Sequence, residues 1–272
     1  MGRQRAFTPL NVYVGSRLAG RLTRTGAGAH YFHYSEEWLS WEMNFPLSLS
    51  LLVRKEPYSG SDVINLFENL LPDHTEIRQR LAAKVGARGT DAFNLLSKIG
   101  RDCVGAMQFI PEGDALVPSH AISGRELTES QVESLLANLS RAPLGLGDED
   151  DFRISIAGVQ DKTALLRMDG TWIEPHGTTP TTHIFKPQIG HLPSGIDLTR
   201  SVENDHFCLE LLRCFGVPTV TTGIEQFGAQ RVLVVTRYDR KWTQDGRLIR
   251  LPQEDFCQAI SLPHSLKYQY QG

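Results

Sequence analysis

Residues 154–166 read ISIAGVQDKTALL. The alternation and the apolar tail are typical of a β-strand, but Gly158, Asp161 and Lys162 interrupt them. We expect residues 153–158 and 162–168 to pair as a hairpin around Gly158-Val159-Gln160. A tight turn brings backbone N–H groups to phosphate oxygens, and glycine lets the backbone approach closely. The stretch therefore predicts a turn that holds nucleotide phosphates, although a single glycine also fits a plain hairpin.

Composition places few limits on function. The chain has 272 residues, of which 40% are hydrophobic and 22% charged, and its net charge is 28 − 31 = −3. The chain as a whole is therefore not a basic nucleic-acid binder, although the net charge does not exclude a local basic face. We expect no membrane span, because no run of 18 apolar residues exists, and no signal peptide, because the N-terminus lacks an apolar core. Four cysteines without a C-x-x-C pair favour reduced thiols in the cytoplasm.

The first half of the chain predicts a mixed α/β domain over residues 1–145. A hairpin is expected at 11–22, strands at 29–33, 47–54 and 104–112, and helices at 61–71, 74–86, 91–100 and 127–139. Ser61 is the expected cap of the first helix, and Thr128 with Gln131 has the spacing of a capping box. The segment RAPLGLGDEDD, residues 141–151, is the expected domain boundary. An acidic loop inside one domain is the alternative.

The second half predicts a β-rich unit over residues 150–272. A strand ends at Lys186, a helix spans 198–216, a strand pair turns at Gly228, and a helix begins near residue 253. The helix carries an apolar stripe of Val202, Phe207, Leu209, Leu212 and Phe215, and Gly216 marks its end.

This order of elements is typical of the small lobe of a kinase. Lys186 would neutralise phosphates as a point charge, Glu203 or Asp205 on the next helix would fix that lysine, and the hinge after the last strand would offer backbone groups to adenine. Each signal alone has an ordinary explanation. Lys186 fits a solvated strand end, the acids fit a solvated face or the first turn of a helix, and Ser155 fits a satisfied strand hydroxyl.

Six stretches together resemble the HipA family of bacterial serine/threonine kinase toxins, which belong to HipBA toxin–antitoxin systems. The resemblance runs essentially end to end. The stretches are FENLLPD (67–73), LLSKIGRDCVGAMQFIPE (95–112), DFRISIAGVQDKTALL (151–166), TPTTHIFKP (179–187), RYDRKW (237–242) and LPQEDFCQA (251–259).

The resemblance implies an α+β chain: an N-terminal mixed α/β domain, then the small, mostly antiparallel β lobe of a phosphatidylinositol-kinase-like, HipA-like kinase. It implies that Ser155 is an autophosphorylation site, and that phosphorylation expels its loop from ATP because like charges repel. The implied ATP-binding residues are Ala157, Gly158, Val159, Gln160, Lys162, Lys186, Val235, Thr236, Arg237 and Tyr238. It also implies Mg²⁺, a HipB-like antitoxin, operator DNA contacted through that antitoxin, and glutamyl-tRNA synthetase as the substrate.

Two departures from the family pattern affect the expected chemistry. Asp205 replaces the usual Glu after Asn204, so its reach toward Lys186 is shorter. The catalytic D-G-H-x-K-N stretch is absent, because Asp169-Gly170 and Asp245-Gly246 belong to predicted hairpin turns. We therefore expect no catalytic base or magnesium ligand on this chain, and no activity unless a separate chain supplies the large lobe. The alternative is a non-catalytic module that binds the antitoxin or its complex with DNA.

Overall fold

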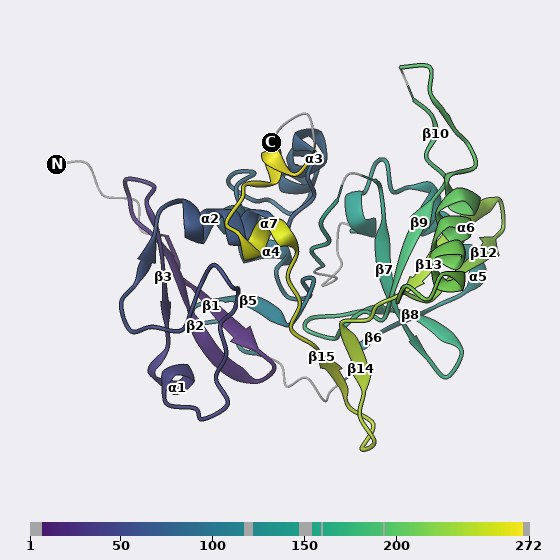
Figure 1. Ribbon diagram of the computed structural model, residues 1–272. Helices are drawn as coiled ribbons and strands as arrows, with labels where there is room; N and C mark the ends of the chain where they lie inside the picture. The colour runs from purple at the N-terminus through teal and green to yellow at the C-terminus, as the bar shows by residue number, and fades with distance from the viewer. Residues whose placement is uncertain (1–6, 117–121, 147–153, 159, 193, 269–272) are drawn as a thin grey trace.

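Two large antiparallel sheets, two short strand pairs and the surrounding helices form the molecule (Figure 1). The computed structural model describes residues 7–116, 122–146, 154–158, 160–192 and 194–268. One sheet is five-stranded with the order β4-β3-β2-β1-β5, and the other is six-stranded with the order β12-β13-β9-β7-β8-β6. The α+β prediction is confirmed.

The five-stranded sheet and its helices come from the first 111 residues. Its strands are β1 (Leu10–Val14), β2 (Arg17–Arg24), β3 (His30–Tyr34), β4 (Tyr58–Ser59) and β5 (Met107–Pro111). Its helices are α1 (Glu36–Leu39), α2 (Ser61–Glu68), α3 (Thr75–Lys84) and α4 (Ala92–Ile99). Leu10, Phe32, Phe67 and Phe109 lie fully inside the core between them. Burial of such side chains is the main source of stability for this half.

Two local predictions in this half are wrong. Residues 47–54 form no strand, because Ser48 pairs only with Leu51 through an isolated bridge and the segment instead receives residues from far along the chain. The Ser50 hydroxyl donates to the Gln258 carbonyl, 2.6 Å away. Helix α2 begins after Gly60, which makes no side-chain cap, so Ser61 is not its cap.

The six-stranded sheet gathers the rest of the chain. Its strands are β6 (Gly124–Leu127), β7 (Thr163–Met168), β8 (Thr171–Pro175), β9 (His183–Pro187), β12 (Thr222–Phe227) and β13 (Gln230–Thr236). The short pairs are β10 (Gly190–His191) with β11 (Asp197–Leu198), and β14 (Arg240–Trp242) with β15 (Leu248–Arg250). Helices α5 (Glu129–Ala137), α6 (Ser201–Cys214) and α7 (Phe256–Ala259) and the 3₁₀ turns η1 (Pro143–Gly145) and η2 (His264–Leu266) complete it.

Residues 124–137 belong to this second sheet, whereas the sequence assigned them to a first domain ending at 145. Strand β6 pairs with β8, and α5 packs through Val132 and Leu136 onto Trp172 and Phe185. The predicted capping box of Thr128 and Gln131 is confirmed at the start of α5. Residues 147–151 of the predicted boundary lie outside the described residues, and residues 141–146 are described.

The predicted hairpin between residues 153–158 and 162–168 is wrong. Strand β7 pairs with β9 through residues 163–165 and with β8 through residues 166–168, and no ladder joins it to the described residues 154–158. Ile154 and Gly158 instead form isolated parallel bridges with Asp102 and Pro72. The segment thus crosses from the second sheet to the first half of the molecule.

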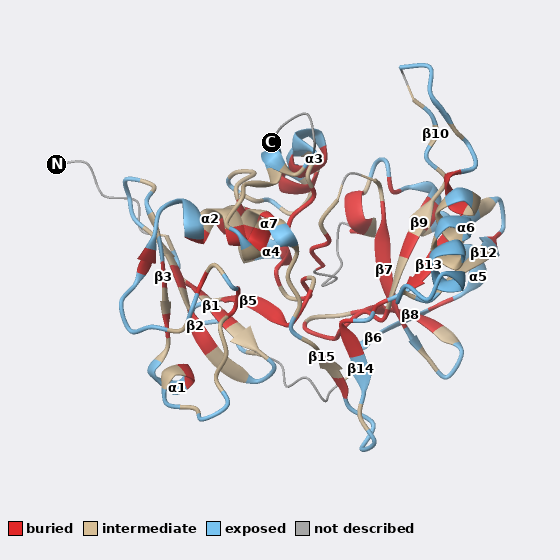
Figure 2. Cartoon of the chain, in the orientation of Figure 1, coloured by how far each residue is buried: buried red, intermediate tan, exposed pale blue. Residues whose placement is uncertain are grey.

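The apolar stripe of α6 faces solvent rather than a core (Figure 2). Val202 is buried, but Phe207 is 64% and Phe215 75% exposed. The helix packs on β12 and β13, and among the described residues no element covers its outer side. The predicted helix is confirmed, and most of its apolar stripe is not buried by the described residues.

Candidate functional site

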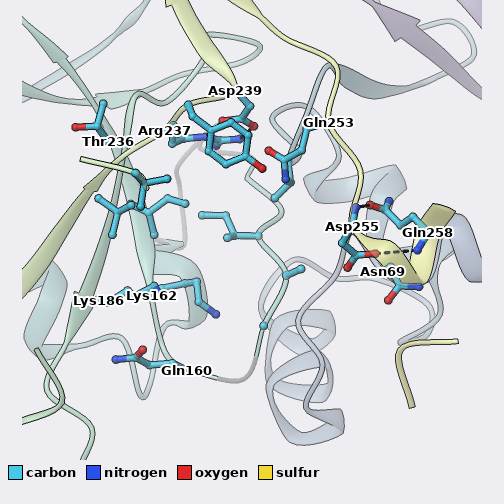
Figure 3. Close-up of a pocket in the computed structure, with 18 of the residues that line it drawn as sticks. Asn69, Gln160, Lys162, Lys186, Thr236, Arg237, Asp239, Gln253, Asp255 and Gln258 are labelled. Atoms are coloured by element: carbon cyan, nitrogen blue, oxygen red, sulfur yellow. Dashed lines mark hydrogen bonds and ion pairs between the residues drawn. The ribbon is translucent and has the colours of Figure 1, made fainter. Parts of the chain in front are cut away.

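A cavity of about 440 Å³ opens between the two halves of the molecule (Figure 3). The second sheet and the segment around Gly158 form one wall. The opposite wall comes from α2, the segment before α7 and the C-terminal segment. Its lining residues are Asn69, Val104, Ile156, Ala157, Gly158, Gln160, Lys162, Ile184, Lys186, Val220, Val235, Thr236, Arg237, Tyr238, Asp239, Gln253, Asp255, Gln258 and Tyr268.

Most of the residues predicted for ATP binding meet at this cavity. They are Ala157, Gly158, Gln160, Lys162, Lys186, Val235, Thr236, Arg237 and Tyr238. Val159 lies outside the described residues. The cavity thus joins segments that are about 80 residues apart in sequence, although their role in binding stays a prediction.

Two lysines from neighbouring strands give the cavity its charge. Lys186 lies on β9, half-buried and opposite Leu233 of β13, while Lys162 precedes β7 and is only 6% exposed. Burial, and then the nearby charge of Lys186, lower the pKa of Lys162 to about 8. Within the described part of the chain, neither amine forms a hydrogen bond or an ion pair. Unpaired buried cations are unfavourable, so a bound anion would stabilise this pair.

Gly158 is required where the chain passes Lys162. Its φ of +109° is a conformation that other residues rarely adopt. A Cβ atom there would lie 3.2 Å from the Lys162 amine. The glycine therefore sets both the path of the loop and the position of the lysine.

Ser155 lies beside the cavity but not in its lining. It is fully buried, and its hydroxyl donates to the Leu70 carbonyl at 2.7 Å. Its amide donates to the Asp102 carbonyl at 3.0 Å. In this arrangement the hydroxyl is not accessible to a phosphate donor, so phosphorylation requires the loop to move.

The two acids predicted to fix Lys186 do not contact it in this structure. Glu203 pairs with Arg231 at 2.5 Å and accepts a hydrogen bond from Gln188 at 2.7 Å. The Gln188 hydrogen bond, helped by Arg231, lowers the pKa of Glu203. Asp205 forms no ion pair within the described residues.

Residues 235–239, at the end of β13 and directly after it, line the cavity. The amides of Thr236 and Arg237 already donate, to the carbonyls of Thr221 and Thr182. The amide of Tyr238 has no acceptor among the described residues, so it is the N–H donor that a ligand could use. The Arg237 side chain is buried in an ionic network, which makes its role structural.

Sequence reasoning missed that network. Asp102 accepts from Arg240 at 2.8 Å, Arg250 at 2.9 Å and Arg237 at 3.4 Å, all nearly inaccessible. Asp239 pairs with Arg237 at 2.7 Å and with Arg240 at 2.9 Å. Asp102 belongs to the first half and the other four residues to the second, so the network joins the two walls of the cavity. The alternating charges of RYDR, residues 237–240, were the available signal.

The opposite wall was also missed as part of the site. Asp255 and Gln258 form a capping box at the start of α7, and Gln258 donates to the Leu66 carbonyl at 3.1 Å. Asn69 donates to the Leu262 carbonyl at 2.9 Å. These bonds hold the C-terminal segment against α2 and so complete the cavity.

Together, the fold and the cavity define an α+β protein with a cationic, glycine-bordered site between two sheets. Comparison with family models gives a match to the HipA N-terminal domain over residues 10–110 and to the HipA-like C-terminal domain over residues 154–272. The chain belongs to the HipA family.

Two similar sequences and one solved structure support this assignment. A putative kinase, Y4mE, from Sinorhizobium fredii is 34% identical over 97% of this chain and 61% of its own length. The serine/threonine-protein kinase toxin HipA of Shewanella oneidensis is 29% identical over 96% of this chain and 57% of its own length. A solved complex of HipA, HipB and operator DNA from Shewanella oneidensis MR-1 matches with a TM-score of 0.75 and 26% identity, over 96% of this chain and 58% of the solved chain.

The chain therefore spans about three-fifths of the length of the relatives that it matches. Among its described residues, no helix has the length and apolar character needed to cross a bilayer.

Proposed function

We propose that the cavity binds ATP and that the chain is the nucleotide-binding part of a HipA-like toxin, an ATP-dependent protein serine/threonine kinase. The observation that carries this proposal is the convergence of Lys162, Lys186 and Gly158 on one cavity, with neither amine paired within the described residues. Two cations beside a close-approaching backbone suit a polyphosphate. Adenine would lie toward the segment after β13 and accept a hydrogen bond from the Tyr238 amide.

Equilibrium binding of MgATP to the 272-residue chain tests this proposal. Lys186→Met should weaken binding by about tenfold or more, because a charge-assisted contact to phosphate is worth about 1.5–3 kcal/mol. Lys241→Met is the matched control, since Lys241 is an exposed lysine on β14 outside the cavity lining. Equal binding by the two variants would contradict an ATP role for the cavity.

Ser155 is the proposed autophosphorylation site. The family resemblance supports this assignment, and the buried serine beside the lysine-lined cavity is compatible with it once the loop has moved. A phosphate carries about −1.5 to −2 charges, so it would repel ATP phosphates and keep the loop from returning. Mass spectrometry after incubation with MgATP and a separate HipA large lobe should find phosphate on Ser155 and none at this position in Ser155→Ala. Phosphate confined to other residues would overturn this assignment.

Phosphoryl transfer to another protein is proposed to need side chains from a second polypeptide. The two Asp-Gly pairs lie in the β7–β8 and β14–β15 turns, outside the cavity lining. Among the described residues, no group of three or more His, Cys, Asp or Glu side chains could hold a metal ion, so we assign Mg²⁺ no ligands there. We propose that a separate large-lobe chain supplies the catalytic base, and that glutamyl-tRNA synthetase is the substrate. The test is a transfer assay with radiolabelled ATP, with and without a HipA large lobe added in trans; activity of the chain alone would contradict the need for that lobe.

A second candidate function is a non-catalytic module that binds a HipB-like antitoxin and, through it, operator DNA. The similarity to a HipA from a complex with HipB and DNA favours this reading, because the match covers 96% of the present chain. A DNA mobility-shift assay with a HipB-type protein and its operator tests it. A supershift that Lys186→Met leaves intact would support binding independent of ATP, and no supershift would contradict it.

Either function places the chain in the cytoplasm, in line with the free thiols of Cys103, Cys208, Cys214 and Cys257.

A further inference from the structure

The loop that borders the lysine pair, residues 154–162, is attached mainly to the first half of the molecule. Ile154 and Ile156 are 1% and 3% exposed, and they pack in the core that also contains Leu70 and Leu71. The loop is thus continuous in sequence with β7 of the second sheet but packed into the other core.

Hydrogen bonds fix the same loop to the same half. The Ser155 hydroxyl donates to the Leu70 carbonyl at 2.7 Å, and the Asp73 amide donates to the Gly158 carbonyl at 3.3 Å. The Ser155 amide donates to the Asp102 carbonyl at 3.0 Å. Because these bonds lie on both sides of residue 157, they fix the ends of the turn that faces the cavity.

Few hydrogen bonds connect the loop, residues 154–162, to the second sheet. Within the described part of the chain, the one hydrogen bond from residues 154–162 to β9 is donated by the Gln160 side chain to the Pro187 carbonyl, at 2.7 Å. A further contact to the first half is the exposed pair of Arg80 and Asp161, at 3.9 Å. Exposed pairs contribute little, so the buried bonds to residues 70–73 and to Asp102 dominate.

We propose that residues 70–73, which link α2 to α3, act as a clamp that positions the glycine loop for nucleotide binding. The inference rests on the proposed function, since it assigns positioning residues to that site. Residues 70–73 are not in the cavity lining, so their backbone acts on the nucleotide through the loop. The Asp73 carboxylate also acts through its charge, which raises the pKa of Lys162 against the larger lowering by burial. A displacement of this segment relative to the second sheet would carry Gly158 away from Lys162 and dismantle the site.

Ser155→Ala tests the clamp with a minimal change of shape. Hydrogen exchange of the loop amides at 155–162, measured by NMR without nucleotide, should accelerate about five- to tenfold, the loss expected for one buried hydrogen bond. The affinity for MgATP should fall several-fold. Pro72→Gly is the second variant: it loosens the clamp, removes no hydrogen-bond donor, and should change exchange and affinity in the same direction.

Ser97→Ala is the matched control. The Ser97 hydroxyl donates to the Asn94 carbonyl on α4 at the same 2.7 Å, remote from the loop. Because Ser97 is only half-buried and its bond lies within α4, the change should leave loop exchange and MgATP affinity unchanged. Loop exchange in Ser155→Ala equal to that in Ser97→Ala would overturn the clamp. If the wild-type chain binds no MgATP, the proposed function fails, whereas the exchange comparison still decides the clamp.

Discussion

The carboxylate of Asp102 lies 2.8 Å from the guanidinium of Arg240, and both side chains are 1% exposed. The two residues come from opposite halves of the molecule, 138 positions apart. Asp102 also bonds Arg250, Arg237 and Thr181, so one carboxylate supports a network behind the cavity.

Asp102→Asn should destabilise the protein strongly. The change leaves three buried arginines beside one remaining acid, and removing one partner of a buried pair costs about 3–5 kcal/mol. Urea unfolding measures the loss. Asp114→Asn is the control. Asp114 also pairs with an arginine, Arg101, but the Asp114 side chain is 49% exposed. We expect this change to lower the unfolding free energy by less than about 1 kcal/mol. Equal losses would show that the network is not supporting the fold.

Acidification should remove the contribution of the Asp102 carboxylate to the unfolding free energy. Burial alone would raise the pKa of Asp102, but Arg240, Arg250 and Arg237 outweigh it and hold the pKa below its usual value. A carboxylate with a lowered folded-state pKa stabilises fully above its unfolded pKa of about 3.9, and this contribution is lost as the pH falls toward the folded value. The difference in unfolding free energy between wild type and Asp102→Asn should therefore shrink below about pH 4. A difference that stays constant down to pH 2.5 would contradict the assignment.

The Lys162 amine should react readily with acylating reagents, and its burial should destabilise the ligand-free protein. With a pKa of about 8, its amine should be labelled by acetic anhydride with a midpoint near pH 8, well below the value of about 10.4 for a free lysine side chain. Since the unfolded chain binds more protons between these two values, stability should rise with pH across that window. Lys162→Met should lack this rise and stabilise the ligand-free protein at pH 7, by up to about 3 kcal/mol. A labelling midpoint near pH 10 would refute the burial argument.

Gly158→Ala should weaken nucleotide binding beyond its effect on stability. The new Cβ atom would press on the Lys162 amine, and the backbone conformation costs about 1–2 kcal/mol for a residue with a side chain. Gly170→Ala is matched for strain, because Gly170 has a φ of +83° but open space around it. We expect both variants to lose stability and only Gly158→Ala to lose MgATP affinity, measured by calorimetry.

The uncovered face of α6 should promote association. Phe207, Leu211 and Phe215 are 64%, 44% and 75% exposed, which is unusual for large apolar side chains on one helix. The double change Phe207→Ser and Phe215→Ser should lower the apparent mass in light scattering. Leu49→Ser, at a site 66% exposed in the first half, should not change it. A wild-type chain that stays monomeric at high concentration would contradict this expectation.

Local signals were enough to predict much of the fold. The hairpin of β1 and β2, the helices α3 to α6 and the hairpin of β12 and β13 follow from periodicity, caps and turn residues. Residues 47–54 and 154–158 were misassigned because both alternate like strands. Their partners lie far away in sequence, at Glu254 and Gln258 in one case and at Pro72 and Asp102 in the other.

The candidate site was predictable only in part. Lys162, Lys186 and Gly158 stand out because charge and glycine interrupt apolar segments. The predicted pairing of Lys186 with Glu203 is absent from the structure, because Glu203 forms an ion pair with Arg231 on β13 instead. The Asp102 network could not be derived from spacing, since its charges come from three separate segments, at residues 102, 237–240 and 250, that only the folded chain brings together.

Residues 254–258 contact the segment around Ser48, and this contact has a consequence for biosynthesis. The Ser48 hydroxyl donates to the Glu254 carboxylate at 2.5 Å, across 206 positions of sequence. A ribosome adds about 5–20 residues per second, so this surface waits on the order of ten to forty seconds after its own synthesis before its partner emerges. During that interval the polar groups of residues 48–50 that later bond Glu254 and Gln258 have only water as their partner.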